Sequence, residues 1–390
     1  MELAYPGKRS RQQILADQQH SILRGIDACD DDSSFLIEGD NAAALGALLH
    51  RRNLAESIDL IYIDPPYATN TVFRHHKDRT STVSAAADSD IAYIDTRRGV
   101  DFLEFLRERL ILLHELLSRH GSMFLHIDYK IGHYVKVIMD EVFGANNFRN
   151  DITRIKCNPK NFARKGFGNI KDMILFYSKG EDFLWHEPKV HLTDADITRL
   201  FAKVDANGRR YTTTPLHAPG ETRNGNTGKE WRGMKPPTGR HWRYDPKVLD
   251  ELDSQGLIEW SATGNPRKII YADDAELKGK KLQDIWEFKD PQYPEYPTEK
   301  NLEMLRTIIT ACTNPGQIVL DCFCGSGTTL VAAEQEHRRW IGIDESPVAI
   351  ETCKKRLEQV QGGLFGRTYG TYAVSERHHD AEHVASNATR

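Results

Sequence analysis

The turn Asp64-Pro65-Pro66-Tyr67 holds the groups in this chain that are best suited to chemistry. Each proline fixes its own φ and keeps the preceding residue out of the helical region, so the turn presents a backbone carbonyl at a fixed angle. The Asp64 carboxylate and the Pro65 carbonyl could accept both N–H bonds of an exocyclic amino group on adenine or cytosine, which would expose its lone pair. Tyr67 offers a face on which an extruded base can stack. The turn predicts an amine-activating site, although Asp-Pro-Pro alone could also be a stiff turn that merely ends a strand.

A second loop, DCFCGSGTT at 321–329, lies between an apolar run and an expected helix starting near Thr328. Its glycines would let the backbone approach a ligand at the end of a parallel strand, although a plain tight turn is the alternative. About twenty residues later the run WIGI ends in Asp344, where an acidic side chain would bind ribose hydroxyls. The third glycine of a dinucleotide fingerprint is absent, and so is GxxxxGK[ST]. The pattern favours an adenosine cofactor without a pyrophosphate.

Positioning these loops requires buried strands that alternate with helices. Short apolar runs bounded by turn residues predict strands at 35–37, 60–63, 123–127, 173–177, 318–320 and 340–343. Apolar residues at three- and four-residue spacing predict helices over 102–117 and 302–312. A third helix is predicted to run to Val360, with Ser346 as its N-cap and Pro347 as its first residue. The alternation indicates a doubly wound α/β sheet.

Length and composition restrict the class of protein. The chain has 390 residues, 39% of them hydrophobic, a formal charge of -4 and no apolar run near the ~18 residues of a membrane-spanning helix. The first twenty residues lack the apolar core of a secretory signal, so we expect a cytoplasmic protein with no membrane partner. The six cysteines are scattered, and the Cys322-x-Cys324 pair has no partner pair, so we expect reduced thiols and no metal site.

The composition and the apolar periodicity of the sequence change between residues 185 and 290. This stretch is rich in Gly, Pro, Thr and Trp without a sustained period, which predicts an inserted, loop-rich second domain. We therefore expect four parts: 1–184 and 291–362 as two pieces of one catalytic domain, 185–290 as the insert, and 363–390 as a polar tail.

The overall charge hides two basic windows. Residues 149–179 hold eight Lys/Arg against two acids, and residues 201–247 hold ten against four, so each window carries +6. The interleaved aromatic residues Phe162, Phe167, Tyr211, Trp231, Trp242 and Tyr244 suit stacking beside phosphate contacts. A basic run is more often a solvated face. Our candidates for contact with nucleic acid are Phe162, Arg164, Lys165, Arg232, Arg240 and Arg243.

Taken together, DPPY, then DCFCGSGTT and IGID far downstream, resemble the motifs of S-adenosylmethionine-dependent DNA amino-methyltransferases. The motif order is that of the permuted β group, which includes the modification subunits of type III restriction systems. HGSMFLHIDY, HYVKVIMDEVFGANNFRND, WRGMKPPTGRHWRYDP and YPTEKNLEMLRTII are also similar to segments of that family, so the resemblance covers roughly residues 35–360. It implies a circularly permuted Rossmann-like class I methyltransferase sheet with an inserted target-recognition domain.

The resemblance also implies roles for single residues. Asp64, Pro65, Pro66 and Tyr67 would act on the target base, Asp344 would bind the ribose of S-adenosylmethionine, and Asp40 would lie near its adenine. Asp40 is equally suited to cap the helix that follows it. Thr298 and Lys300 would hold the methionine carboxylate, although Lys300 could also be a surface lysine. The remaining expected cofactor residues are Asp321, Phe323, Gly325, Ser326, Gly327 and Thr328.

Some positions depart from the family pattern. Ala68 and Asn301 stand where Asn and Pro are common, and Cys322 and Cys324 replace the commoner Pro and Ala. These departures affect the details of the cofactor site and leave the reaction type standing.

The main hypothesis is N6-adenine methylation of double-stranded DNA, because Asp at the first motif position favours adenine over cytosine N4. The alternatives are N4-cytosine methylation, an RNA methyltransferase, and a catalytically silent DNA-binding subunit on the same fold. No Pro-Cys pair is present for C5-cytosine chemistry, and the absence of a Walker A motif and of a convincing nuclease motif disfavours a helicase or nuclease. A second copy of the chain and a separate restriction subunit are candidate partners.

Overall fold

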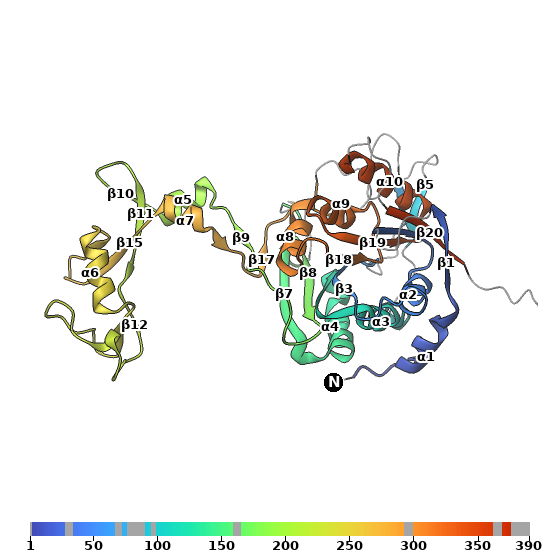
Figure 1. The fold of residues 1–390 in the computed structure, drawn as a ribbon, viewed down its shortest axis with the longest axis horizontal. Helices are drawn as coiled ribbons and strands as arrows, with labels where there is room; N and C mark the ends of the chain where they lie inside the picture. Colours follow the sequence, from blue (N-terminus) through green and yellow to red (C-terminus); the bar gives the residue numbers. More distant parts are fainter. Residues whose placement is uncertain are drawn as a thin grey trace, which may run out of the picture. The chain divides into compact units, whose positions relative to one another are not determined.

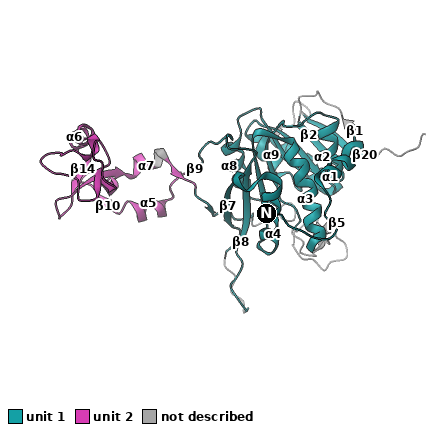
Figure 2. Ribbon diagram, turned by 90° about the horizontal axis from the view of Figure 1, so that it is seen from below, with its two compact units in different colours: residues 1–188, 283–390 teal, residues 189–282 magenta. Residues whose placement is uncertain are grey.

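The computed structural model describes residues 2–27, 34–66, 72–75, 90–94, 99–158, 165–291, 299–361 and 369–375. It divides the chain into two compact units, residues 1–188 with 283–390, and residues 189–282 (Figure 2). The sequence placed an inserted domain at 185–290. Unit 1 carries both chemical loops, and Tyr67, Phe162, Arg164 and Thr298 lie outside the described residues.

Unit 1 is built on a ten-stranded sheet with the order β1-β20-β2-β19-β18-β3-β6-β8-β7-β17 (Figure 1). Its strands are β1 (Ile22–Asp27), β2 (Ser34–Glu38), β3 (Ile58–Ile63), β6 (Leu117–Ile127), β7 (Phe148–Ile155), β8 (Lys171–Ser178), β17 (Ile285–Trp286), β18 (Ile318–Asp321), β19 (Arg339–Asp344) and β20 (Tyr369–Ser375). The five strands from β2 to β6 in this order are parallel, and β8 is antiparallel to both β6 and β7. The six predicted strands are confirmed, and so is the mostly parallel α/β class.

Helices cover both faces of this sheet. The helices of unit 1 are α1 (Arg11–Asp17), α2 (Asn41–His50), α3 (Gly99–Leu116), α4 (Tyr129–Phe143), α8 (Leu302–Cys312), α9 (Thr328–Gln335) and α10 (Pro347–Gln361). Contacts join α2, α3 and α4 into one layer and α8, α9 and α10 into the other, and Figure 1 shows the sheet between them. The central strands are apolar on both faces: one face packs with α2, α3 and α4 into a continuous core, and α8, α9 and α10 also carry buried apolar side chains.

The sheet is clamped at the edge opposite the chemical loops by Asp59 at the start of β3. Its carboxylate accepts hydrogen bonds from the amide of Ile318, the first residue of β18 (3.0 Å), and from the side chain of Gln317, the residue before it (2.8 Å). These contacts join β3 and β18 across 259 positions of sequence. They fix the pairing of the two strands on which the site depends.

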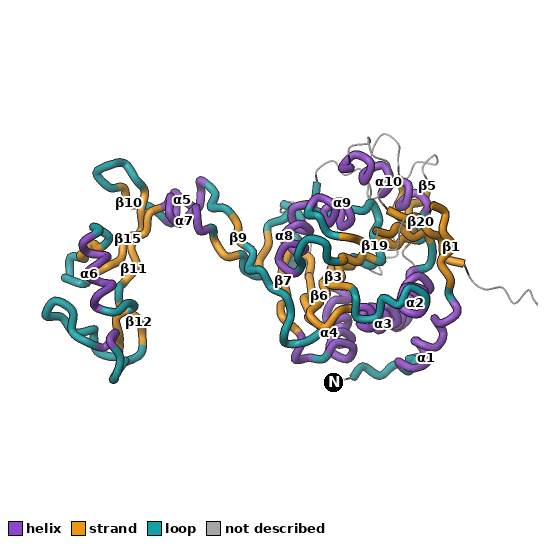
Figure 3. Tube along the Cα trace, in the orientation of Figure 1, coloured by secondary structure: helices purple, strands orange, loops and turns teal. Residues whose placement is uncertain are grey.

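Unit 2 is a smaller body of short strands and helices (Figure 3). Its four-stranded sheet has the order β10-β11-β15-β14, made of β10 (Lys203–Val204), β11 (Arg210–Pro215), β15 (Pro266–Tyr271) and β14 (Ile258–Trp260). Further elements are β9 (Lys189–Val190), α5 (Asp194–Leu200), β12 (His217–Pro219), β13 (Arg240–Trp242), α6 (Pro246–Ser254), α7 (Ala272–Lys278) and β16 (Lys280–Lys281). Pairing of β9 with β16 brings the entering and leaving chain together.

Two aromatic candidates for base stacking form the core of unit 2 instead. Trp231 and Trp242 are each 2% exposed and pack edge to face, together with Leu216, Leu249 and Leu252. A small body with few aliphatic residues needs its largest apolar side chains inside. Stacking of these two rings on nucleic acid is therefore ruled out.

The C-terminal region corrects the predicted polar tail. Tyr369–Ser375 forms β20, which pairs parallel with β2 and antiparallel with β1, and Tyr369 is fully buried. Its sequence, YGTYAVS, carries aromatic and β-branched residues that favour a strand, and we missed it because the polar residues around it dominated the composition. The sheet thus continues past β2 by two strands that the sequence analysis did not predict.

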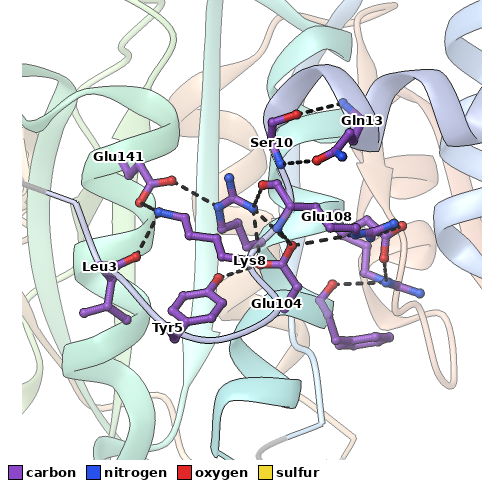
Figure 4. A network of polar contacts seen from close by, with 12 residues as sticks. Leu3, Tyr5, Lys8, Ser10, Gln13, Glu104, Glu108 and Glu141 are labelled. Carbon is purple, nitrogen blue, oxygen red and sulfur yellow. Dashed lines mark hydrogen bonds and ion pairs between the residues drawn. The ribbon is translucent and has the colours of Figure 1, made fainter.

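The N-terminal segment, residues 2–20, is attached to α3 and α4 by a polar network (Figure 4). Glu104 on α3 accepts hydrogen bonds from the Tyr5 hydroxyl (2.5 Å), the Arg9 amide (3.1 Å) and Arg107 (3.2 Å). Glu141 on α4 pairs with Lys8 (2.8 Å) and Arg107 (3.0 Å). Since Arg107 is only 4% exposed, its charge depends on these carboxylates.

We expect Glu104→Ala to lower the free energy of unfolding by about 2 kcal/mol, because it leaves the buried Arg107 with fewer acceptors and releases Tyr5. Glu104→Gln keeps an acceptor of the same shape and should lose about half as much. Urea unfolding monitored by circular dichroism measures both. Equal stability of the wild type and Glu104→Ala would show that the network does not stabilise the fold.

Candidate active site

Parallel pairing brings the two chemical loops to the same edge of the sheet. β3 ends just before Asp64, and its neighbour β18 ends at Asp321, with Leu60 opposite Val319 and Ile61 opposite Leu320. The carboxyl ends of adjacent parallel strands in an α/β sheet form the usual ligand crevice. β19 and β2 add Asp344 and Asp40 along the same edge.

Asp64 is paired with Lys300 at 2.7 Å, and their side chains are 17% and 12% exposed. Pro65 is buried behind the carboxylate and Pro66 is half-buried, so the turn is held against the fold. Lys300 comes from the segment that precedes α8, which begins at the Asn301 N-cap. The structure thus joins the expected amine-activating residue to the residue expected to hold the methionine carboxylate.

The glycine loop is shaped by its backbone. Gly325 and Gly327 have φ angles of +50° and +76°, and a Cβ on Gly327 would lie 2.7 Å from the Cys353 sulfur. A side chain at Gly327 would therefore be strained by conformation and by contact. The Cys353 thiol itself donates to the Gly325 carbonyl at 3.1 Å, so α10 packs directly under the loop.

Two carboxylates hold the loop by accepting hydrogen bonds. Asp321, 2% exposed, accepts from the Phe323 amide (3.0 Å) and the Thr329 hydroxyl (2.6 Å). Asp344 accepts from the amides of Gly325 and Ser346, each at 2.9 Å. Burial raises the pKa of Asp321 to about 7 and loss of solvent raises that of Asp344 to about 6. Each carboxylate thus orders the backbone at the carboxyl end of its strand.

Arg356 on α10 is a site residue that the sequence analysis missed. It donates to the Ser326 hydroxyl (2.9 Å) and to the Thr328 hydroxyl (3.0 Å), and it pairs with Glu299 at 2.8 Å. Ser326 and Thr328 are 4% and 5% exposed, so their hydroxyls serve the loop's own structure. The arginine also ties the loop to the residue before Lys300. Its position in a charged helix gave no sequence signal.

Asp40 takes the capping role that the sequence analysis weighed against contact with the cofactor's adenine, and that contact stays a prediction. Its carboxylate caps α2 by accepting from the Ala43 amide at 3.0 Å, and it pairs with Arg109 at 2.9 Å. The side chain is nevertheless 52% exposed and lines an open cavity of about 420 Å³ together with Phe105. Phe105 meets Phe323 of the glycine loop edge to face, with centroids 6.1 Å apart, so the cavity adjoins the loop.

These features fit an adenosine cofactor. Positive-φ glycines allow close backbone approach, the cavity beside Asp40 can take a base, and Lys300 carries the charge that a carboxylate needs. Among the described residues no group of three or more His, Cys, Asp or Glu side chains is arranged to hold a metal ion. Across the described ranges, no helix is both long enough and apolar enough to cross a membrane.

The candidates for nucleic-acid contact are placed in part. Lys165 is exposed in unit 1, and Arg240 and Arg243 are exposed in unit 2. Arg232, with φ +50°, pairs with Asp253 at 2.6 Å. Burial and the charges of Arg240, Arg243 and Arg267 lower the pKa of His217, which identifies a cationic cluster around this residue.

Comparison with known proteins supports the same chemistry. A family model described as DNA methylase, of the N6 and N4 methyltransferase type, matches residues 58–355. The type II methyltransferase M.EcaI of Enterobacter cloacae is 42% identical over 367 residues, covering 91% of this chain and 77% of that protein. The StyLTI Mod subunit of Salmonella typhimurium, a type III restriction-modification enzyme, is 26% identical over 364 residues, covering 83% of this chain and 52% of the subunit. The crystal structure of the M1.HpyAVI–SAM complex matches 83% of this chain and 99% of its own, with 19% identity and a TM-score of 0.43.

We expect Asp321→Asn to remove a pH dependence of stability. Between pH 4 and 7 the unfolded wild type loses the Asp321 proton while the folded protein keeps it, so the free energy of unfolding falls as pH rises, by at most about 1.4 kcal/mol per unit. The amide cannot ionise, so the variant should gain stability relative to wild type over this range. Urea unfolding at pH 5, 6 and 7 measures the difference, and parallel curves for the two proteins would contradict a raised pKa.

Proposed function

The chain belongs to the N6/N4 DNA methylase family, and on that premise we propose that it methylates the N6 amino group of adenine at a specific short site in double-stranded DNA, after base flipping. The observation that carries the proposal is Asp64 at the end of β3, fixed by Pro65 and Pro66 and paired with Lys300 beside the glycine loop. An aspartate at this position favours adenine.

The residues of this chain act by positioning and polarisation. When bound, S-adenosylmethionine supplies a methyl group on a positively charged sulfur. The Asp64 carboxylate and the Pro65 carbonyl accept the two N–H bonds of the target amine and expose its lone pair toward that methyl group. Transfer would form a C–N bond to the amine and break the C–S bond of the cofactor, with the bonding electrons left on sulfur and one amine proton lost to solvent. Placing both reactants at one sheet edge accounts for most of the rate gain.

Unit 2 is the proposed target-recognition domain. The cationic cluster of Arg240, Arg243 and Arg267 around His217 suits DNA phosphates, and Arg240 and Arg243 are exposed. We place the protein in the cytoplasm as the modification enzyme of a restriction-modification system. A second copy of the chain and a restriction subunit are its proposed partners.

Labelled S-adenosylmethionine incubated with the protein and DNA, followed by digestion to nucleosides, tests the function. We expect the label in N6-methyladenine, and sequencing of the methylated DNA should reveal one short recognition site. Label in 4-methylcytosine would overturn the choice of base, and a wild type without any transfer would overturn the enzyme assignment.

Asp64→Asn should lower kcat by about 100-fold or more, because an amide accepts the amine proton far less well than a carboxylate. DNA affinity, measured by fluorescence anisotropy, should change less than threefold. Asp182→Asn, which removes a carboxylate that is 97% exposed on unit 1, is the matched control and should keep its activity. Wild-type kcat in Asp64→Asn would contradict the proposed role.

Arg243→Ala should weaken DNA binding about tenfold at moderate salt and reduce the slope of log affinity against log salt by about one. Lys136→Met, which removes a cation on α4 of unit 1, is the control. Binding measured from 50 to 300 mM salt decides the outcome, and an unchanged slope for Arg243→Ala would remove this residue from the DNA surface.

A further inference from the structure

A cluster of buried polar side chains lies at the active edge of the sheet, beyond the motifs discussed above. It comprises Tyr62 on β3, His126 on β6, Asp172 on β8, and Arg154 and Lys156 on or just after β7. These four strands are neighbours in the sheet, in the order β3-β6-β8-β7. Tyr62, His126, Asp172 and Arg154 are each no more than 2% exposed, so the group is enclosed by protein.

Asp172 is the residue that the others share. It accepts from His126 Nε2 at 3.2 Å and from Lys156 Nζ at 2.6 Å, and Arg154 Nη1 lies 3.6 Å away. Because an ionised carboxylate only accepts, Nε2 of His126 carries the proton, and Nδ1 accepts from the Tyr62 hydroxyl at 2.9 Å. The ionised carboxylate of Asp172 therefore fixes the direction of the hydrogen bonds from Tyr62 to His126 and from His126 to Asp172.

The charge states agree with this pattern. Burial would raise the pKa of Asp172, but the hydrogen bond from His126 and the ammonium of Lys156 outweigh it and hold the pKa well below its usual range. Burial and the nearby charge of Lys300 lower the pKa of His126, so the ring is neutral at physiological pH. Asp172 is thus a permanent buried negative charge.

The cluster reaches both partners of the Asp64–Lys300 ion pair. On one side Tyr62 precedes Asp64 by two residues on β3. On the other side Arg154 donates to the Phe288 carbonyl at 2.7 Å and also pairs with Asp290. Between these two residues, the Lys289 carbonyl accepts from the Asn301 side chain at 2.9 Å, next to Lys300.

A buried ionic group is seldom a net gain in stability over apolar packing. The cluster lies at the active edge of the sheet and contacts both β3, which leads to Asp64, and the segment that leads to Lys300. This position fits a role in catalysis. We propose that Asp172 is a positioning residue for methyl transfer: through His126 and Tyr62 it sets the end of β3, and through Arg154 it sets the segment that carries Lys300. The inference rests on the proposed function and assigns the placement of the ion pair to a residue outside both loops.

The test compares two matched variants. Asp172→Asn keeps the shape of the side chain and removes its charge. Asp140→Asn removes a carboxylate with similar partners, since Asp140 accepts from Lys136 (2.6 Å) and from the Tyr177 hydroxyl (2.7 Å) on α4 and β8, apart from the cluster. We expect kcat to fall 10- to 100-fold in Asp172→Asn, with KM for DNA and cofactor within about threefold of wild type, and to stay within threefold in Asp140→Asn.

A second measurement does not depend on activity. Brief treatment with an amine-acylating reagent, followed by peptide mass spectrometry, reports how well Lys300 is held by Asp64. We expect labelling of Lys300 to rise several-fold in Asp172→Asn and to stay at the wild-type level in Asp140→Asn. Thermal unfolding of both variants identifies any general loss of structure.

The outcomes separate the two proposals. A folded Asp172→Asn with wild-type kcat and wild-type labelling overturns the inference while the wild type still methylates DNA. An equal loss of kcat in Asp140→Asn also overturns it. A wild type that transfers no methyl group overturns the proposed function, and the labelling of Lys300 still decides the placement. If Asp172→Asn does not fold, Tyr62→Phe takes its place, with an expected threefold to tenfold fall in kcat and raised labelling; wild-type values for both overturn the inference.

Discussion

The parallel pairing of β3 with β18 is the constraint on which the rest of the site depends. It aligns the ends of two strands that are separated by most of the chain, so that Asp64 and Asp321 emerge at one edge. Asp59 fixes this pairing from the far end through the amide of Ile318. Because side chains alternate between the faces of a sheet, a slip by one residue would turn the loop-bearing ends away from each other. Chemistry at one edge therefore depends on a hydrogen bond at the other.

The glycine loop is ordered by buried carboxylates, although burial disfavours their charged form. Burial raises the pKa of both Asp321 and Asp344, and the charges of Asp64 and Asp344 raise that of Asp321 further. Each carboxylate nevertheless accepts two hydrogen bonds, so the loop's amides and a hydroxyl are satisfied without solvent. Arg356 on α10 adds hydrogen bonds to the hydroxyls of Ser326 and Thr328 and ties the loop to Glu299. The loop is thus rigid before any ligand arrives, which favours binding by reducing the ordering cost.

The sequence predicted the central strands, the two loops and the family, because these depend on local patterns: apolar runs, positive-φ glycines and a rigid Asp-Pro-Pro turn. It did not predict β1 or β20, whose place is set by pairing with β2 and whose own composition is mixed. The partners Arg356 and Asp172 were also missed, since a single charged residue in a helix or strand looks the same whether it faces solvent or a loop distant in sequence. The roles given to the individual cofactor and DNA residues stay predictions.

The distribution of charge shows the same limit of prediction from sequence: a count of basic residues does not tell which of them are exposed. The first basic window carried +6 in sequence, yet Arg154 is fully buried against Asp290 and Lys156 is paired with Asp172. Charges compensated inside the protein attract no phosphate, because the field of a neutralised pair falls off steeply. In unit 2, by contrast, Arg240 and Arg243 face solvent around His217, and they lie close enough together to lower its pKa. Among the described residues of the first window, Arg154 and Lys156 thus serve the active edge of the sheet, whereas Lys165 and Lys171 are exposed, as Arg240 and Arg243 are in the second window.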